Sequence, residues 1–79
     1  MATYQLSDRI TVNQAVMVGK PVIRGLRITV EQILKALAGG VSIQDLLGDY
    51  PELEPEDINA VLLYAAELVS EEQVFEVGA

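Results

Sequence analysis

Three helix-start signals follow one another along this chain, and they constrain its fold more than any other feature. Thr29 and Gln32 match a capping box, in which the Thr29 hydroxyl accepts a hydrogen bond from the Gln32 N–H and the Gln32 side chain reaches back. Ser42 is a favourable N-cap, and Pro55 suits the first turn of a helix. Apolar residues at three- and four-residue spacing follow each signal. The pattern predicts helices over about residues 30–38, 43–48 and 55–70.

The segment ILKALAGGVSIQDLL, which runs from the first predicted helix through the turn into the second, is typical of a helix-turn-helix. Gly40 permits a sharp turn, Ala36 is small enough for two helices to cross closely, and Ser42 caps the second helix. A plain pair of packed helices would show the same spacing, so both interpretations stay open.

The stretch before the helices is rich in β-branched residues and predicts a small β element over about residues 10–28, with residues 10–18 extended. This stretch is interrupted by Gly19, Pro21 and Gly25. Pro21 cannot donate a ladder hydrogen bond, so its strand should lie at a sheet edge. Gly25 indicates a positive φ or a close backbone approach.

The third predicted helix has an apolar stripe wide enough to cover both a core and a second surface. The stripe consists of Ile58, Val61, Leu62, Ala65, Leu68 and Val69. Residues 71–79 alternate apolar and acidic residues and are expected to be extended or flexible. We expect one mainly α domain over residues 1–79, and its small size favours a homodimer.

Charge is divided unevenly along the 79 residues, whose formal net charge is −7. Residues 1–40 carry five basic residues against two acids, a net of +3, whereas residues 41–79 carry ten acids and no Lys or Arg. The basic half could bind a polyanion or an acidic partner. Alternatively, the basic half of one copy could attract the acidic half of another across a dimer.

Most of the basic residues gather around the β element and the first predicted helix. We predict that DNA or a partner is bound by Lys20, Arg24, Arg27 and Lys35, with Gln44 from the second helix. Asp45 and Asp49 argue against base reading by that helix, because carboxylates repel phosphates. Alternatively, Arg24 and Arg27 pair with the acidic half of the chain, either within the monomer or across a dimer.

Several chemistries are excluded or disfavoured by composition. Without Cys or His the chain has no disulfide, thiolate metal site, cysteine nucleophile or imidazole base. The acidic cluster (Glu52, Glu54, Glu56 and Asp57) is interpreted as a solvated helix start. We therefore expect no enzyme activity, no cofactor and no metal. No apolar run approaches about 18 residues and no secretory signal is recognisable, so we expect a cytoplasmic protein without membrane contact.

Several short motifs together resemble one prokaryotic family: Gly19-Lys20-Pro21, Ile23-Arg24-Gly25, Arg27-Ile28, Gly40-Val41-Ser42, Asp49-Tyr50-Pro51 and Glu56-Asp57-Ile58. Over about residues 10–66 the chain is similar to the domain of unknown function four-three-three family, part of which is described as VapB-like antitoxins. The resemblance implies a homeodomain-like or winged helix-turn-helix fold. It also implies neutralisation of a PIN-like ribonuclease toxin and autorepression, since the genes often neighbour such toxins. Leu26 stands where the family usually has Thr.

Two hypotheses follow. In the first, a homodimeric antitoxin binds DNA through its basic half and a toxin through its acidic third helix and tail. In the second, the chain is a dimeric protein-interaction module that does not bind DNA.

Overall fold

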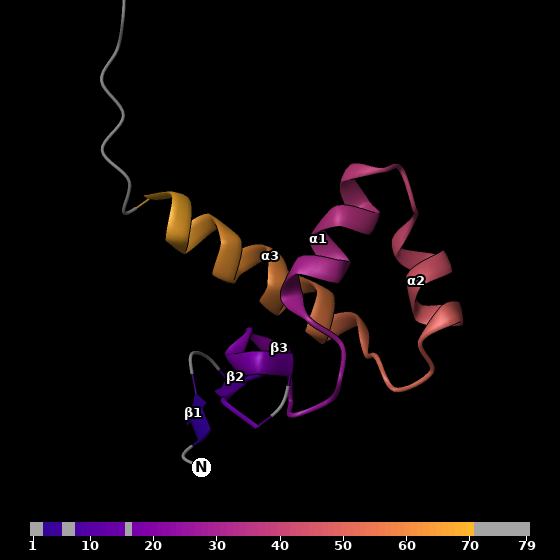
Figure 1. Cartoon of the computed structure of the whole chain (residues 1–79). Helices are drawn as coiled ribbons and strands as arrows, with labels where there is room; N and C mark the ends of the chain where they lie inside the picture. Colours follow the sequence, from indigo (N-terminus) through magenta and orange to yellow (C-terminus); the bar gives the residue numbers. More distant parts are fainter. Residues whose placement is uncertain (1–2, 6–7, 16, 71–79) are drawn as a thin grey trace, which may run out of the picture.

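A computed structural model of the chain describes residues 3–5, 8–15 and 17–70. Within these residues the elements are β1 (Thr3–Gln5), β2 (Ile10–Asn13), the 3-10 turn η1 (Met17–Gly19), β3 (Val22–Ile23), α1 (Val30–Ala38), α2 (Ile43–Asp49) and α3 (Pro55–Ser70). Figure 1 shows the small sheet on one side of α3 and the pair α1 and α2 on the other. The predicted mainly helical fold with a short N-terminal β element is confirmed. The predicted tail, 71–79, lies outside the described residues.

The described strands form an antiparallel sheet in the order β1-β2-β3. Ile10 pairs with Ile23 across β2 and β3. β3 therefore lies at an edge, as Pro21 predicted. The Pro21 carbonyl accepts a hydrogen bond from the Val30 N–H at 3.0 Å, which ties the sheet to the start of α1.

The β element differs from the prediction in two places. The prediction of an extended segment over residues 10–18 is wrong beyond Asn13. The chain turns there and enters η1, with φ values of 51° at Met17 and 56° at Val18. β1 lies before the predicted range and pairs with β2. Gly25 has φ +75° with open space where a Cβ would stand, so its positive φ explains the glycine.

The helix boundaries follow the local capping chemistry. Both hydrogen bonds of the capping box form between Thr29 and Gln32. Gly40 turns the chain at φ +94°, and the Ser42 side chain accepts from the Asp45 N–H at 3.0 Å. α1 and α3 have the predicted bounds, and α2 extends one residue further. α1 and α2 both pack on α3. The helix-turn-helix assignment stays a prediction.

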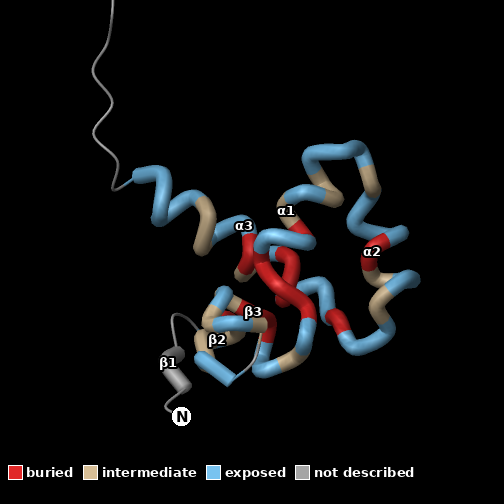
Figure 2. Tube along the Cα trace, viewed as in Figure 1, coloured by how far each residue is buried: buried red, intermediate tan, exposed pale blue. Residues whose placement is uncertain are grey.

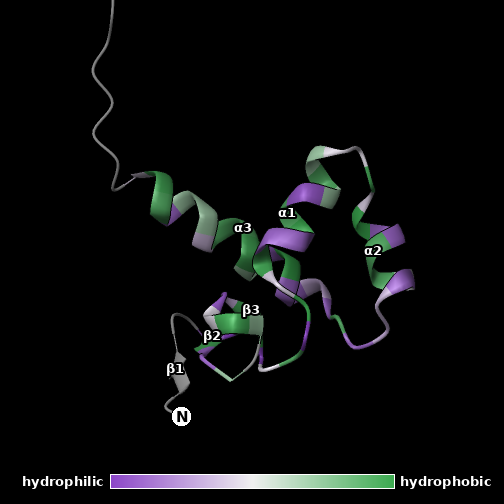
Figure 3. Cartoon of the chain, in the orientation of Figure 1, coloured by the Kyte–Doolittle hydropathy of each residue, from purple (hydrophilic) through white to green (hydrophobic). Residues whose placement is uncertain are grey.

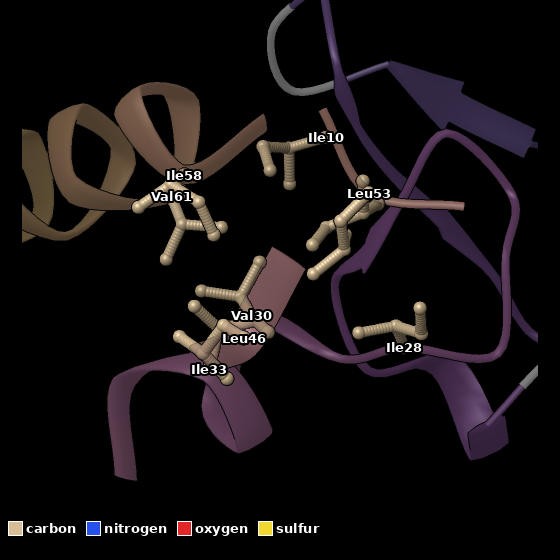
Figure 4. Close-up of a cluster of buried hydrophobic side chains, with 9 residues drawn as sticks. Ile10, Ile28, Val30, Ile33, Leu46, Leu53, Ile58 and Val61 are labelled. Atoms are coloured by element: carbon tan, nitrogen blue, oxygen red, sulfur yellow. The ribbon is translucent and has the colours of Figure 1, made fainter. Parts of the chain in front are cut away.

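A single hydrophobic cluster joins the sheet to all three helices (Figure 4). Its buried members are Ile10, Ile23, Ile28, Val30, Ile33, Leu46, Leu53, Ile58 and Val61. The red segments in Figure 2 show that this core lies where the sheet, α1 and the first half of α3 meet. Ile33 is completely buried in the cluster, so truncating it to Ala should cost about 2 to 5 kcal/mol.

The C-terminal half of α3 projects beyond this core. Figure 2 shows it largely exposed, while Figure 3 shows that the same turns are mainly hydrophobic. The predicted apolar stripe covers the core with Ile58 and Val61, whereas Leu68 and Val69 are exposed, so a second surface covered by the stripe stays a prediction. No described helix is long and apolar enough to span a membrane.

Candidate functional site

A buried carboxylate, Asp57, joins two arginines near the N-terminus of α3, and we call the group Arg9, Arg24 and Asp57 the arginine–aspartate cluster. The Asp57 residue is 0 % exposed. Arg9 Nη1 donates to Oδ1 at 2.9 Å, and Arg24 donates from Nε to Oδ1 at 3.0 Å and from Nη2 to Oδ2 at 2.9 Å. The Glu54 N–H donates to Oδ2 at 2.8 Å. Both carboxylate oxygens are thus satisfied in the interior.

These contacts decide the protonation of the cluster. Burial raises the pKa of the Asp57 carboxyl, but hydrogen bonds from Arg24, the Glu54 N–H and Arg9 outweigh it and lower the pKa from 3.8 to about 2. The hydrogen bond to Asp57 raises the pKa of Arg24 in turn. The interpretation of Asp57 as part of a solvated helix start is wrong, because two distant arginines cover it. Its neighbours Glu52, Glu54 and Glu56 are exposed, as expected.

Arg24 is therefore engaged in the fold. Besides Asp57, it donates to the Glu52 carbonyl from Nη2 at 2.7 Å, so it fastens the end of β3 to the start of α3. This is the pairing with the acidic half that the sequence left open for Arg24. The pairing speaks against the predicted binding role of this residue.

The structure brings three other predicted binding residues together. Lys20, Arg27 and Lys35 line one open surface hollow of about 710 Å³ between η1 and α1, which we call the basic hollow. Gln14 and Gln32 add amide groups to its lining. Arg27 is exposed and, within the described residues, makes no ion pair. The alternative that Arg27 pairs with the acidic half finds no partner in this part of the chain.

Glu31 bridges the two lysines of the basic hollow, and we call these three residues the lysine–glutamate cluster. Lys20 Nζ lies 2.9 Å from Oε1, and Lys35 Nζ lies 2.9 Å from Oε2. The hydrogen bonds from Lys20 and Lys35 lower the pKa of Glu31 to about 2. All three side chains are about half exposed or more, so water and ions compete with these pairs.

A strained turn forms one wall of the basic hollow. Met17 and Val18 are consecutive residues with positive φ, and Val18 is 90 % exposed. A β-branched residue in the left-handed region is a genuine outlier. Sequence reasoning missed this feature, because Met17 and Val18 have the composition of a strand.

Gln44 lies apart from the basic hollow. It is exposed on α2 beside Asp45, and α2 contributes no lining residue to the hollow. Gln44 therefore does not act together with Lys20, Arg27 and Lys35 on one surface.

Two further grooves flank α3. The first, about 260 Å³, is lined by Asp8, Glu56, Leu63 and Glu67, together with Arg9, Asn59 and Ala60, and we call it the acidic groove. Leu63 is 59 % exposed within it. Arg9 is engaged with Glu54 and Asp57, and the groove presents the exposed Leu63 among the carboxylates of Asp8, Glu56 and Glu67.

The second groove, about 300 Å³, lies between α1 and α3 and is mostly apolar, and we call it the apolar groove. Pro21, Val30, Leu34, Tyr64 and Leu68 line it. Lys20, Glu31 and Lys35 line both this groove and the basic hollow, so the two depressions adjoin.

No group of three or more acidic residues among those described could hold a metal ion.

Comparison with family models finds a match over residues 10–65 to the family described as protein of unknown function (DUF433). No curated protein matches the chain, and no solved structure does.

Proposed function

The chain belongs to the DUF433 family of proteins of unknown function, and on this premise we propose that it is an antitoxin-like protein that neutralises a PIN-like ribonuclease toxin. The proposed function is binding, not catalysis, and it takes no cofactor. It would be carried out in the cytoplasm.

The observation that carries the proposal is the acidic groove of α3. A ribonuclease has to bind the phosphate backbone of RNA, and this favours a basic substrate surface. Asp8, Glu56 and Glu67 would complement such a surface, while the exposed Leu63 would supply an apolar anchor at the centre. An acidic protein that covers a basic cleft excludes RNA from it.

Binding to a purified PIN-like ribonuclease tests the proposal. We expect a stable complex, and we expect Leu63→Gln to weaken it about tenfold or more, as for the loss of a central anchor. The matched control is Ile43→Gln, another exposed apolar residue, on α2, whose replacement should leave the affinity unchanged. Absence of any complex with the wild-type chain at low salt would contradict the proposal.

A second candidate function, DNA binding for autoregulation, is favoured by the basic hollow. Lys20, Arg27 and Lys35 converge there, and Arg27 is exposed and, among the described residues, not in an ion pair. One such patch gives weak binding, so a dimer that contacts two half-sites would be required.

A salt titration of binding to the DNA upstream of its own gene tests this candidate. Replacing Lys20, Arg27 and Lys35 together by Ala should weaken binding and reduce the slope of log affinity against log salt by about 0.9 per lost phosphate contact. Gln44→Ala should leave that slope unchanged. A wild-type dimer that does not bind DNA at low salt would favour the alternative function, a dimeric protein-interaction module.

A further inference from the structure

The basic hollow gathers positive charge on a chain that is otherwise strongly acidic. Lys20, Arg27 and Lys35 line it, and Glu31 is the single acid among its described lining residues. The hollow therefore carries a net charge of +2, although the formal net charge of the chain is −7. A depression lined by one sign of charge raises the local concentration of ions of the opposite sign. The hollow is thus suited to an anion.

The two ammonium groups of the hollow already hold an anionic group in common. Lys20 Nζ lies 2.9 Å from Oε1 of Glu31, and Lys35 Nζ lies 2.9 Å from Oε2. Each lysine thus contacts one oxygen of the same carboxylate. A phosphate group offers pairs of oxygens at a similar spacing and accepts the same charge-assisted hydrogen bonds. The Glu31 carboxylate therefore marks a place where a phosphate group would fit between the two lysines.

Arg27 adds a third cation that Glu31 leaves unused. Its side chain lines the same hollow, is exposed and makes no ion pair with any described residue. A guanidinium presents a planar fork of donors that matches phosphate geometry. A phosphate monoester carries three strong acceptor oxygens and up to about two negative charges, whereas a carboxylate has two oxygens and one charge. A phosphate group could engage all three cations at once.

The backbone beside the hollow is strained. Met17, Val18 and Gly19 have consecutive positive φ values of 51°, 56° and 75°. The Lys20 N–H closes this turn on the Met17 carbonyl at 3.1 Å, so the strained residues fix where the Lys20 side chain begins. Core packing does not explain the strain, because Val18 is 90 % exposed. Residues held in sparsely populated conformations cluster at ligand sites, which is consistent with a binding role for the adjoining hollow.

We propose that the basic hollow is a phosphate-binding site, in which a phosphate group of the ligand displaces Glu31 from Lys20 and Lys35 and also binds Arg27. Glu31 is then a competitor built into the site, and its half-exposed side chain can turn out into water. The carboxylate is ionised at neutral pH with or without the lysines, since its ordinary pKa is 4.5 and the lysines lower it to about 2. After displacement it still repels the ligand, so removing its charge should strengthen binding.

Two sources of phosphate share this chemistry, the backbone of a nucleic acid and a free phosphorylated small molecule. The first would deepen the DNA-binding candidate, whereas the second does not require DNA binding at all. The inference is also separate from toxin binding, because the acidic groove and the basic hollow have no lining residue in common.

Titration with inorganic pyrophosphate at low salt, followed by NMR of the backbone amides, tests the proposal. The amide signals that move should belong to residues lining the basic hollow. Glu31→Gln should raise the affinity about three- to tenfold, because two exposed ion pairs no longer compete. Arg27→Gln should lower the affinity about tenfold, as for the loss of a hydrogen bond to a charged group. The matched control is Glu56→Gln, which changes the net charge equally but lies in the acidic groove, and it should change the affinity by less than about twofold.

A short DNA duplex, titrated into the same proteins, separates the two sources. If Glu31→Gln strengthens binding of both pyrophosphate and DNA, the phosphate comes from a nucleic-acid backbone. If it strengthens binding of pyrophosphate alone, the site takes a small phosphorylated ligand, and the DNA-binding candidate fails while the phosphate site stands. Circular dichroism checks that every variant keeps its helices.

The pyrophosphate titration also decides against the proposal, whatever the DNA duplex shows. The phosphate site is ruled out if pyrophosphate moves no amide signal at the hollow in either the wild type or Glu31→Gln. It is equally ruled out if Glu31→Gln raises the affinity no more than Glu56→Gln does, since the effect would then come from net charge and not from competition at the site.

Discussion

The arginine–aspartate cluster and the lysine–glutamate cluster contain the same charges, two cations and one carboxylate, in different surroundings. Asp57 is buried and receives hydrogen bonds from Arg9, Arg24 and a backbone N–H. Glu31 is about half exposed and receives one contact from each of Lys20 and Lys35. The first group holds the sheet against α3, whereas the second lies on an open surface.

The comparison shows that burial decides how firmly a charged side chain is held within the fold. Removing one member of a buried pair leaves an uncompensated charge in the interior, so the group cannot be released for binding. Exposed pairs contribute little and exchange readily with water or with another ion. Lys20 and Lys35 are therefore held only by exposed ion pairs, whereas Arg24 is held by its hydrogen bonds to the buried Asp57.

The largest expected effect is on Asp57. Asp57→Ala should lower the free energy of unfolding by about 3 to 5 kcal/mol, because Arg24 would lose its carboxylate partner and Arg9 would keep only Glu54. Urea denaturation followed by circular dichroism measures the change. Glu31→Ala is the matched control and should leave the denaturation midpoint within experimental error. Equal losses for the two variants would remove the distinction between the clusters.

The second-largest effect is expected at low pH, where protonation of Asp57 should weaken the arginine–aspartate cluster. The folded-state pKa of Asp57, about 2, lies below its ordinary value of 3.8, so the carboxylate stabilises the fold above about pH 4. That contribution, about 2 kcal/mol, should be lost as the pH falls from about 4 to about 2. Carboxyl NMR titration of the folded protein checks the assignment, and an Asp57 carboxyl that titrates at its ordinary pKa would contradict it.

A smaller loss is expected from Arg24→Lys. The guanidinium binds both Asp57 oxygens, from Nε and from Nη2, and an ammonium group cannot reproduce this fork. Losing one of these bonds should cost about 1 to 2 kcal/mol in the free energy of unfolding. The reciprocal change Lys20→Arg should have no measurable effect on stability. A stable Arg24→Lys variant would show that charge alone, without geometry, holds the cluster.

The smallest effect concerns salt. At about 1 M salt the Debye length falls to about 3 Å, so exposed pairs are screened far more than buried ones. The pKa of Glu31 should then rise from about 2 toward its ordinary value of 4.5, whereas the pKa of Asp57 should stay low. NMR titration at low and high salt measures both groups in one sample. A parallel rise of the two pKa values would place both carboxylates in similar surroundings.

The helices could be predicted from the sequence because their signals are local. Thr29 and Gln32 are three residues apart, and Ser42 contacts the first turn of its own helix. The strand end at Asn13 could not be predicted, because Met17 and Val18 adopt left-handed φ values that their residue types disfavour. The family resemblance over about 10–66 agrees with the matched range 10–65.

The ion pairs between residues far apart in the chain could not be predicted from the sequence. Asp57 is 48 residues from Arg9 and 33 from Arg24, so nothing local distinguished it from the exposed acids beside it. Arg24 and Arg27 likewise look equivalent in the sequence, yet only Arg24 reaches the start of α3. The uneven charge along the sequence led us to group Lys20, Arg27 and Lys35, and the structure places all three on one surface. Gln44 is not on that surface, because α2 contributes no residue to it.

Cleavage of RNA by a purified PIN-like ribonuclease, measured while this protein is added stepwise, tests the central claim most directly. The account predicts that cleavage stops at an equimolar amount of the wild-type chain, that Ile43→Gln behaves like the wild type, and that Leu63→Gln requires a large excess. Undiminished cleavage at a saturating amount of folded wild-type protein would contradict the antitoxin proposal.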